Sequence, residues 1–174
     1  MKLRALTASK GRLQPVPTRE RQRLMDAYIA AWNSHDADEV AKFFAPDAVY
    51  DDRGPALVAR GRGEIRDHVA TVLAGFPDMR FEYERTFGGE SFIGAEWKVQ
   101  MTHEGELYGL AATGRRLASG GVDIATLDEN GLVTHLVSYY DGAAIMRQLG
   151  VLPGRGSRGE RLLVRAASLF PRRS

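Results

Sequence analysis

Cysteine is absent from the 174 residues of this chain. Without thiols the protein can form neither a disulfide framework nor a thiolate metal site, so its fold depends on packing alone. No apolar run approaches the roughly 20 residues that cross a membrane, and no uninterrupted apolar segment opens the N-terminus. We therefore expect a cytoplasmic protein.

Several common catalytic and binding motifs are also missing. The four histidines form no short-range pair that could begin a metal site. No Gly-x-Ser-x-Gly nucleophile elbow occurs, and the single G-x-G-x-x-G match, at 154–159, follows no predicted strand. We expect neither a metal nor a cofactor.

The charge is unevenly distributed, although the net value is only +2. Residues 1–23 carry seven Lys or Arg against one acidic residue, and residues 151–174 carry six Arg against one. Residues 24–150 hold 11 basic and 20 acidic side chains. An acidic centre repels phosphate backbones, so we expect no nucleic-acid partner.

The 44% hydrophobic content suits one domain, which at this length buries roughly 68–70% of its unfolded surface. We expect a flexible basic arm over 1–17, a folded domain over 18–152 and a basic amphipathic helical tail over 153–174. For the tail we favour packing on its own domain or on a second copy in a homodimer. Contact with a membrane or an acidic partner is the weaker alternative.

The periodicity of the domain predicts its fold class. Apolar residues at helical spacing predict four helices, at 18–33, between Asp36 and Pro46, at 65–76 and at 141–150. Alternating patterns predict a short strand at 48–51 and two antiparallel hairpins, 79–103 and 115–140. This order implies an α+β domain in which helices cover one face of a curved antiparallel sheet around a conical pocket.

Asp123 stands in an apolar run, residues 121–127, whose composition predicts a β-strand. Aspartate is depleted in strands, and burial there disfavours the charged form and raises the pKa toward neutrality. Such a carboxylate is a candidate general base. The alternative is a buried aspartate satisfied by backbone N–H groups or by Arg115 or Arg116, because structural ion pairs also perturb pKa values.

His103 ends the predicted strand 95–103 on the same parity as Trp97 and Met101, so its side chain should lie on the apolar side. We therefore expect one cavity that holds the carboxylate of Asp123 and the imidazole of His103. The alternative is a core histidine hydrogen-bonded to a neighbour, because strand parity gives direction but not depth.

Read together, these segments resemble the SnoaL-like polyketide cyclases, in the superfamily of nuclear transport factor 2 and ketosteroid isomerase. The resemblance spans about residues 24–152. It rests on short motifs in a fixed order, namely Ala31-Trp32-Asn33-Ser34-His35-Asp36, Gly75-Phe76-Pro77-Asp78, Thr102-His103-Glu104-Gly105, Thr113-Gly114-Arg115-Arg116 and Gly121-Val122-Asp123-Ile124.

The resemblance implies a cystatin-like α+β barrel with a cone-shaped hydrophobic pocket. It also implies a cofactor-independent intramolecular aldol condensation that closes a ring on an aromatic polyketide ester. An aspartate on a late strand is the family's acid/base group, and Asp123 matches that segment. His103 matches the Thr-His-x-Gly segment and would polarise the carbonyl or enolate oxygen.

Large apolar residues are candidates for the lining of this pocket, although such residues are more often plain core. We expect about half of the following six to touch a hydrophobic ligand: Trp32, Phe44, Tyr50, Phe76, Trp97 and Met101. Asp51 and Asp52 could be charges at the pocket mouth, but a solvated strand end is the favoured interpretation. The segment 104–114 is a candidate lid.

The sequence thus favours an enzyme, a cyclase or related acid/base catalyst. The alternative is a module of the same fold that binds a small molecule or dimerises through its open sheet face without chemistry, because a fold does not fix a reaction.

Overall fold

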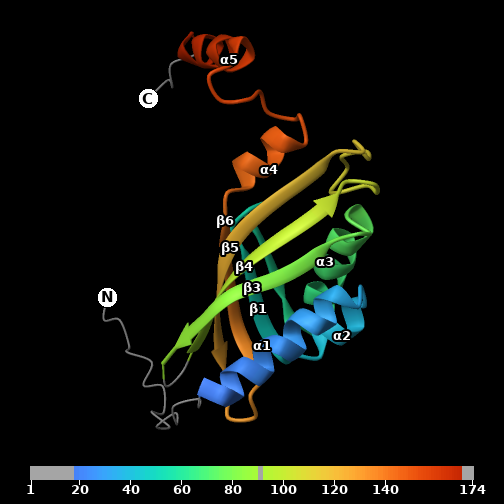
Figure 1. The fold of residues 1–174 in the computed structure, drawn as a ribbon, viewed down its shortest axis with the longest axis vertical. Coiled ribbons are helices and arrows are strands. Elements are labelled where there is room, and N and C mark those ends of the chain that lie inside the picture. Colours follow the sequence, from blue (N-terminus) through green and yellow to red (C-terminus); the bar gives the residue numbers. More distant parts are fainter. Residues whose placement is uncertain (1–17, 90–91, 170–174) are drawn as a thin grey trace, which may run out of the picture.

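The computed structural model describes residues 18–89 and 92–169. The basic arm predicted over 1–17 lies outside the described residues, as do 90–91 and the last five residues of the tail. The described chain contains five helices and six strands (Figure 1).

The six strands form one curved sheet of mixed direction, in the order β2-β1-β6-β5-β4-β3. Their bounds are β1 Phe44–Asp52, β2 Leu57–Arg60, β3 Arg80–Gly88, β4 Phe92–Thr102, β5 Arg116–Leu127 and β6 Val133–Tyr140. Strand β1 runs parallel to β6, and every other neighbouring pair is antiparallel. The sheet does not close, since β2 and β3 each have one free edge among the described strands.

Three helices cover one face of this sheet. The helices are α1 Thr18–Asn33, α2 Ala37–Ala41, α3 Gly61–Gly75, α4 Gly142–Gln148 and α5 Arg158–Ser168. Figure 1 shows α1, α2 and α3 on the concave side, while α4 follows β6 at one end. The predicted α+β class with a curved sheet around helices is confirmed.

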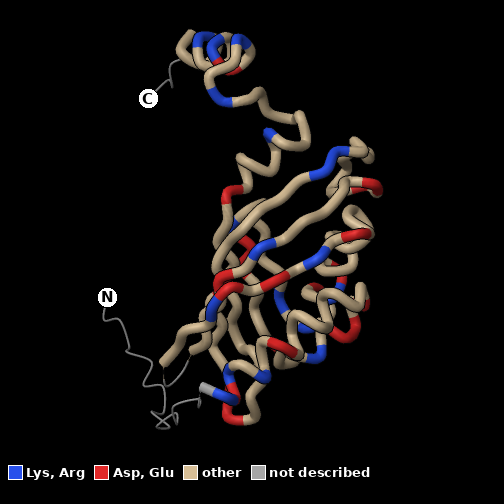
Figure 2. Tube along the Cα trace, viewed as in Figure 1, with Lys and Arg blue, Asp and Glu red and all other residues tan. Residues whose placement is uncertain are grey.

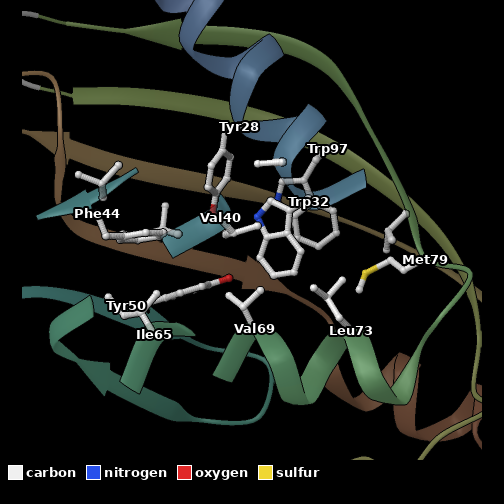
Figure 3. Packing of buried hydrophobic residues seen from close by; sticks show 14 of the residues in the cluster. Tyr28, Trp32, Val40, Phe44, Tyr50, Ile65, Val69, Leu73, Met79 and Trp97 are labelled. Atoms are coloured by element: carbon white, nitrogen blue, oxygen red, sulfur yellow. The ribbon is translucent and has the colours of Figure 1, made fainter. Parts of the chain in front are cut away.

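The core lies between α1, α3 and the concave face of the sheet. Phe44, Ile65, Val40 and Val69 are fully buried there, and Figure 3 shows them packed between the helices and strands. Burying such side chains stabilises the fold by roughly 1.5–3 kcal/mol each. With no cysteine present, this cluster holds the helices against the sheet.

The segment around residues 42–60 differs from the prediction. Helix α2 ends at Ala41, and β1 already begins at Phe44, whose carbonyl accepts hydrogen bonds from Arg62 instead of continuing a helix. A short strand, β2, then pairs with the end of β1 after a turn in which Ala56 has φ of 57°. The sequence did not predict β2, because only Ala59 among its four residues is buried and no alternation marks it.

Helix α5 is amphipathic as predicted, but it does not pack on the domain. It extends beyond the end of the sheet, and its leucines Leu162 and Leu163 are 66% and 53% exposed (Figure 1). Basic positions follow its length (Figure 2). Of the two favoured arrangements of the tail, packing on its own domain is therefore wrong, and packing on a second copy stays a prediction. No helix in residues 18–89 or 92–169 is long and apolar enough to cross a membrane.

Candidate active site

A pocket opens between the concave face of the sheet and helices α1 and α3. Helix α1 contributes Tyr28 and Trp32, and α3 contributes His68. The walls are mostly apolar, and the polar groups gather at a few points on the sheet. This combination of an apolar cavity and a few convergent polar groups is typical of a small-molecule site.

Asp123 lies on β5 with its carboxylate in this pocket. Its Oδ1 accepts two hydrogen bonds, from Trp97 Nε1 at 2.8 Å and from Ser138 Oγ at 2.6 Å. No described residue donates to Oδ2. One oxygen is thus fixed by the sheet, while the other has lone pairs free for a ligand.

Burial raises the pKa of Asp123 from its ordinary value of 3.8 to about 6, and the negative charge of Asp52 acts in the same direction. The hydrogen bonds from Ser138 and Trp97 oppose this rise because they stabilise the ionised form. A carboxylate in this range is ionised at neutral pH yet basic enough to remove a proton from an activated carbon.

A second carboxylate faces the same pocket. Asp52 pairs with Ser138 across β1 and β6, and Ser138 pairs with Asp123 across β6 and β5. The two carboxylates therefore stand two strands apart, about 10 Å between their Cα atoms at about 4.8 Å per strand. Ser138 lies between them and is buried.

Asp52 belongs to a buried chain of polar side chains. Its Oδ2 lies 3.2 Å from His68 Nε2, and its Oδ1 accepts a hydrogen bond from the backbone N–H of Gly54. On the other side of the imidazole, the Tyr108 hydroxyl lies 2.8 Å from Nδ1. The His68 and Asp52 side chains are only 3% and 6% exposed. The chain runs from the sheet through α3 to the loop that follows β4.

A family model for SnoaL-like polyketide cyclases matches residues 22–149, well over half of the chain. The protein belongs to the SnoaL-like polyketide cyclase family. No curated protein sequence matches it.

Solved structures share the fold of this family member. AclR from Streptomyces galilaeus, described as a candidate hydroxylase, is 23% identical with a TM-score of 0.70, over 88% of this chain and 95% of its own. A protein from Catenulispora acidiphila with a ketosteroid isomerase-like fold is 17% identical, with a TM-score of 0.64 over 73% and 92%. IdmH from Streptomyces antibioticus, a candidate polyketide cyclase, is 21% identical, with a TM-score of 0.63 over 75% and 99%. These likenesses establish a ketosteroid isomerase-like fold.

Most of the residues predicted to line the pocket do so. Trp32, Tyr50, Phe76, Trp97 and Met101 all contribute to its walls. Phe44 does not, because it is fully buried in the core and stacks on Tyr50 at 6.0 Å between ring centroids. For Phe44 the plain-core interpretation holds, as Figure 3 shows.

His103, which matches a family motif, is not in the pocket. Asp123 pairs with Ala95 of β4, and His103 comes eight residues after Ala95, about 26 Å further along the chain at about 3.3 Å per residue. Its ring is fully buried against Phe76, and its Nδ1 lies 3.1 Å from Thr113 Oγ1. The expectation that His103 shares a cavity with Asp123 is therefore wrong, and the core-histidine alternative describes its surroundings.

The imidazole that does lie in the pocket belongs to His68, which the sequence did not predict as a site residue. His68 stands three residues after Ile65 and four before Val72, on the apolar side of α3. Asp52 shares the strand parity of the buried Ala48 and Tyr50, and it is itself buried rather than solvated. Helical spacing and strand parity were thus the available signals for both residues.

The alternative for Asp123 was a carboxylate paired with Arg115 or Arg116. Its hydrogen-bond partners are Trp97 and Ser138, with no arginine among them. The candidate lid contributes Leu107 and Tyr108 to the pocket. In the part of the chain that the structure describes, no group of three or more His, Asp or Glu side chains is placed to hold a metal ion.

Proposed function

We propose that this protein is an acid/base enzyme of the polyketide cyclase type, with Asp123 as the general base. Its substrate would be a hydrophobic small molecule with two carbonyl groups. The observation that carries the proposal is the state of Asp123, a carboxylate of raised pKa that lines an apolar pocket and whose Oδ2 accepts no hydrogen bond from a described residue.

The proposed reaction is an intramolecular aldol condensation. Asp123 takes a proton from the carbon next to a carbonyl group, which leaves an enolate. The enolate carbon attacks a second carbonyl carbon of the same molecule, a C–C bond forms, and the new alkoxide oxygen takes up a proton. Protons are the only species exchanged with the protein, so the step requires neither an oxidant nor a reductant. A positioned general base contributes roughly 10²–10⁴-fold to such a rate.

The walls of the pocket favour an aromatic substrate. Trp32 and Trp97 each contact Phe81, with ring centroids at 5.2 and 5.4 Å, so the wall near Asp123 is built of packed rings. Aromatic rings prefer offset or edge-to-face contacts, which such a wall offers to a fused-ring ligand. Excluding water there also strengthens the electrostatic interactions that stabilise an enolate.

The deciding experiment incubates the purified protein with an aromatic polyketide keto-ester and separates the products by chromatography with mass detection. Asp123→Asn keeps the size and the Oδ1 acceptor of the side chain but removes the base. The matched control is Asp47→Asn, on an exposed position of β1 that touches no part of the pocket.

We expect cyclised product with the native protein and with Asp47→Asn, and at least a 10²-fold loss with Asp123→Asn. Equal turnover by Asp123→Asn would assign the base to another residue. If the native protein binds the keto-ester without converting it, the non-catalytic binding module becomes the better account of the pocket.

A further inference from the structure

Apart from the charge of Asp52, which raises the pKa of Asp123, the chain Asp52–His68–Tyr108 has no part in the role proposed for Asp123, yet all three side chains line the same pocket. Two of the three are buried, and every heteroatom contact between them is within 3.2 Å. Desolvating a carboxylate and an imidazole costs free energy unless the groups are paired, so this arrangement needs an explanation beyond packing.

We propose that Tyr108, supported by His68 and Asp52, is the proton donor to the oxygen of the bound substrate. The inference rests on the proposed function, because it supplies the acid that complements Asp123. Tyr108 is the catalytic residue of the chain, whereas His68 and Asp52 are positioning residues that act through it.

The contacts define the direction of each hydrogen bond. The carboxylate of Asp52 can only accept, so His68 Nε2 carries a proton and donates it. When the imidazole is neutral, Nδ1 has no proton and accepts from the Tyr108 hydroxyl. When the imidazole is protonated, Nδ1 donates to the Tyr108 oxygen, and the phenolic proton is free to point to a ligand.

The protonated form gives a balanced step. As Asp123 removes a proton from carbon, the negative charge develops on the substrate oxygen, and that oxygen takes the phenolic proton of Tyr108. The Tyr108 oxygen takes the Nδ1 proton of His68. The Nε2 proton stays on His68 and keeps its hydrogen bond to Asp52. Water then takes the proton from Asp123 and returns one to His68, which restores the starting state.

The position of Tyr108 suits a donor that meets a ligand. It lies in the loop after β4, it is 46% exposed, and its backbone has φ of 48° next to Gly109 at 84°. The side chain thus lines the pocket while staying partly exposed, and His68 holds its hydroxyl. The Tyr50 ring packs edge-on against His68, with centroids 5.1 Å apart, and fixes the imidazole plane.

Burial raises the pKa of Tyr108 to about 12, with the charge of Asp52 as a second cause. The phenol therefore keeps its proton in the resting protein and gives it up only to a strong base such as an enolate or alkoxide oxygen. This behaviour supports the donor role, which the contacts alone establish as geometrically possible.

The test follows hydrogen–deuterium exchange at the carbon next to the carbonyl of 2-tetralone in D₂O by NMR. Tyr108→Phe removes only the hydroxyl and keeps the ring that packs on His68. The matched control is Tyr139→Phe, an exposed tyrosine of β6 outside the pocket. We expect Tyr108→Phe to slow the exchange by about 10²-fold and the control to leave it unchanged.

A rescue experiment separates a positioning role from a structural one. His68→Ala should slow the exchange, and added imidazole should restore it in His68→Ala but not in the double variant with Tyr108→Phe. Because His68→Ala could unfold, the unfolding temperature is measured in parallel and His68→Gln is tested as the milder variant. Native exchange rates in Tyr108→Phe, or imidazole rescue of the double variant, would overturn the proposal.

Failure of the proposed function has a different signature. If the native protein does not accelerate the exchange, the proposal that Asp123 is the base is rejected. The donor role of Tyr108 is then tested by the binding of 2-naphthol, an analogue of the enol. At least tenfold weaker binding of 2-naphthol to Tyr108→Phe than to Tyr139→Phe would sustain Tyr108 as a donor to ligand oxygen. Equal affinity would reject it.

Discussion

The proposed base, Asp123, can act only while it is ionised, and this fixes the direction of the expected pH dependence. Burial raises its pKa to about 6, so the fraction of protein that carries the ionised base should rise with pH through 6. On the acid side we expect kcat/KM to increase tenfold per pH unit, with the midpoint of this limb near pH 6. The measurement is the initial rate of cyclisation between pH 4.5 and 8. A profile already flat at pH 5 would remove Asp123 from the base role.

The same raised pKa predicts that Asp123 destabilises the fold at neutral pH. The folded carboxyl has its pKa at about 6, against 3.8 as its ordinary value, so between these values the native state binds more protons than the unfolded chain. Stability conferred by the protonated carboxyl is complete below about pH 4 and is lost as pH rises through 6. Above that the ionised group costs on the order of 1–3 kcal/mol, at about 1.4 kcal/mol per pKa unit.

Asp123→Asn should therefore unfold at a higher temperature than the native protein at pH 8, even though it lacks activity. Its Oδ1 can still accept from Trp97 and Ser138. The gain should shrink through pH 6 and vanish below pH 4, as followed by thermal unfolding at each pH. A variant less stable at pH 8 would mean that the hydrogen bonds to the carboxylate outweigh its desolvation.

Single residues also mark how far the sequence could predict this site. The polarity of Asp123 in an apolar strand was sufficient to find it, because such a conflict is rare. His103 shared the correct parity but lies beyond the pocket, because parity gives the face of a strand and not the position along it. His68 was not predicted, since a histidine on the apolar face of a helix cannot be distinguished from a core residue until the residues that face it are known.

At the scale of elements, β5 positions the proposed base Asp123 by placing Gly121 against the indole of Trp97. Gly121 pairs with Trp97 of β4, and a Cβ at Gly121 would lie 2.5 Å from the Trp97 ring and 2.5 Å from the backbone oxygen of Tyr139. Glycine thus lets the indole lie flat on the strand, with Nε1 directed at Asp123.

Gly121→Ala should destabilise the protein by about 1–3 kcal/mol through overpacking. Displacement of the indole would also weaken the bond that lowers the pKa of Asp123, so the midpoint of the pH–rate profile should move upward. The control is Gly63→Ala on α3, which meets nothing within 4 Å and should stabilise the helix by up to about 1 kcal/mol. An unchanged midpoint with Gly121→Ala would mean that Trp97 does not tune the base.

Elements with strong local signals were predictable, and those that depend on distant partners were not. The hairpin of β5 and β6 is marked by alternation and by the turn 128–131, where Gly131 has φ of 79°. The parallel pairing of β1 with β6 joins segments more than 80 residues apart, and no local pattern encodes it. Because Asp52 reaches the pocket through that pairing, its strand parity alone did not decide between a charge at the pocket mouth and the solvated strand end that was favoured.

At the scale of the whole molecule, the acidic domain and its basic tail are separate in space as well as in sequence. The pocket is built entirely from residues before position 147, and α5 buries none of its residues. The ion pairs between them are Arg147–Glu160 at 3.7 Å and Arg155–Asp141 at 4.0 Å, and all four side chains are at least partly exposed. Such a pair is worth about 0–1 kcal/mol.

A chain truncated after Pro153 should therefore keep its fold and its activity. The truncation removes six arginines and one glutamate and changes the formal net charge from +2 to −3. We expect the unfolding temperature to change by less than about 4 °C, since 1 kcal/mol shifts it by about 2–4 °C at this size. Turnover of the keto-ester should match that of the full chain.

Sedimentation of both chains decides what the tail does instead. The sequence favours a homodimer, and an exposed apolar helix face is a surface that a second copy could cover. If the full chain sediments as a dimer and the truncated chain as a monomer, α5 holds the second copy. If both are dimers, the dimer forms on the domain, and the open outer face of β5 and β6 becomes its site. A truncated chain that unfolds or aggregates would contradict the independence of the domain, because no residue of α5 belongs to the buried core.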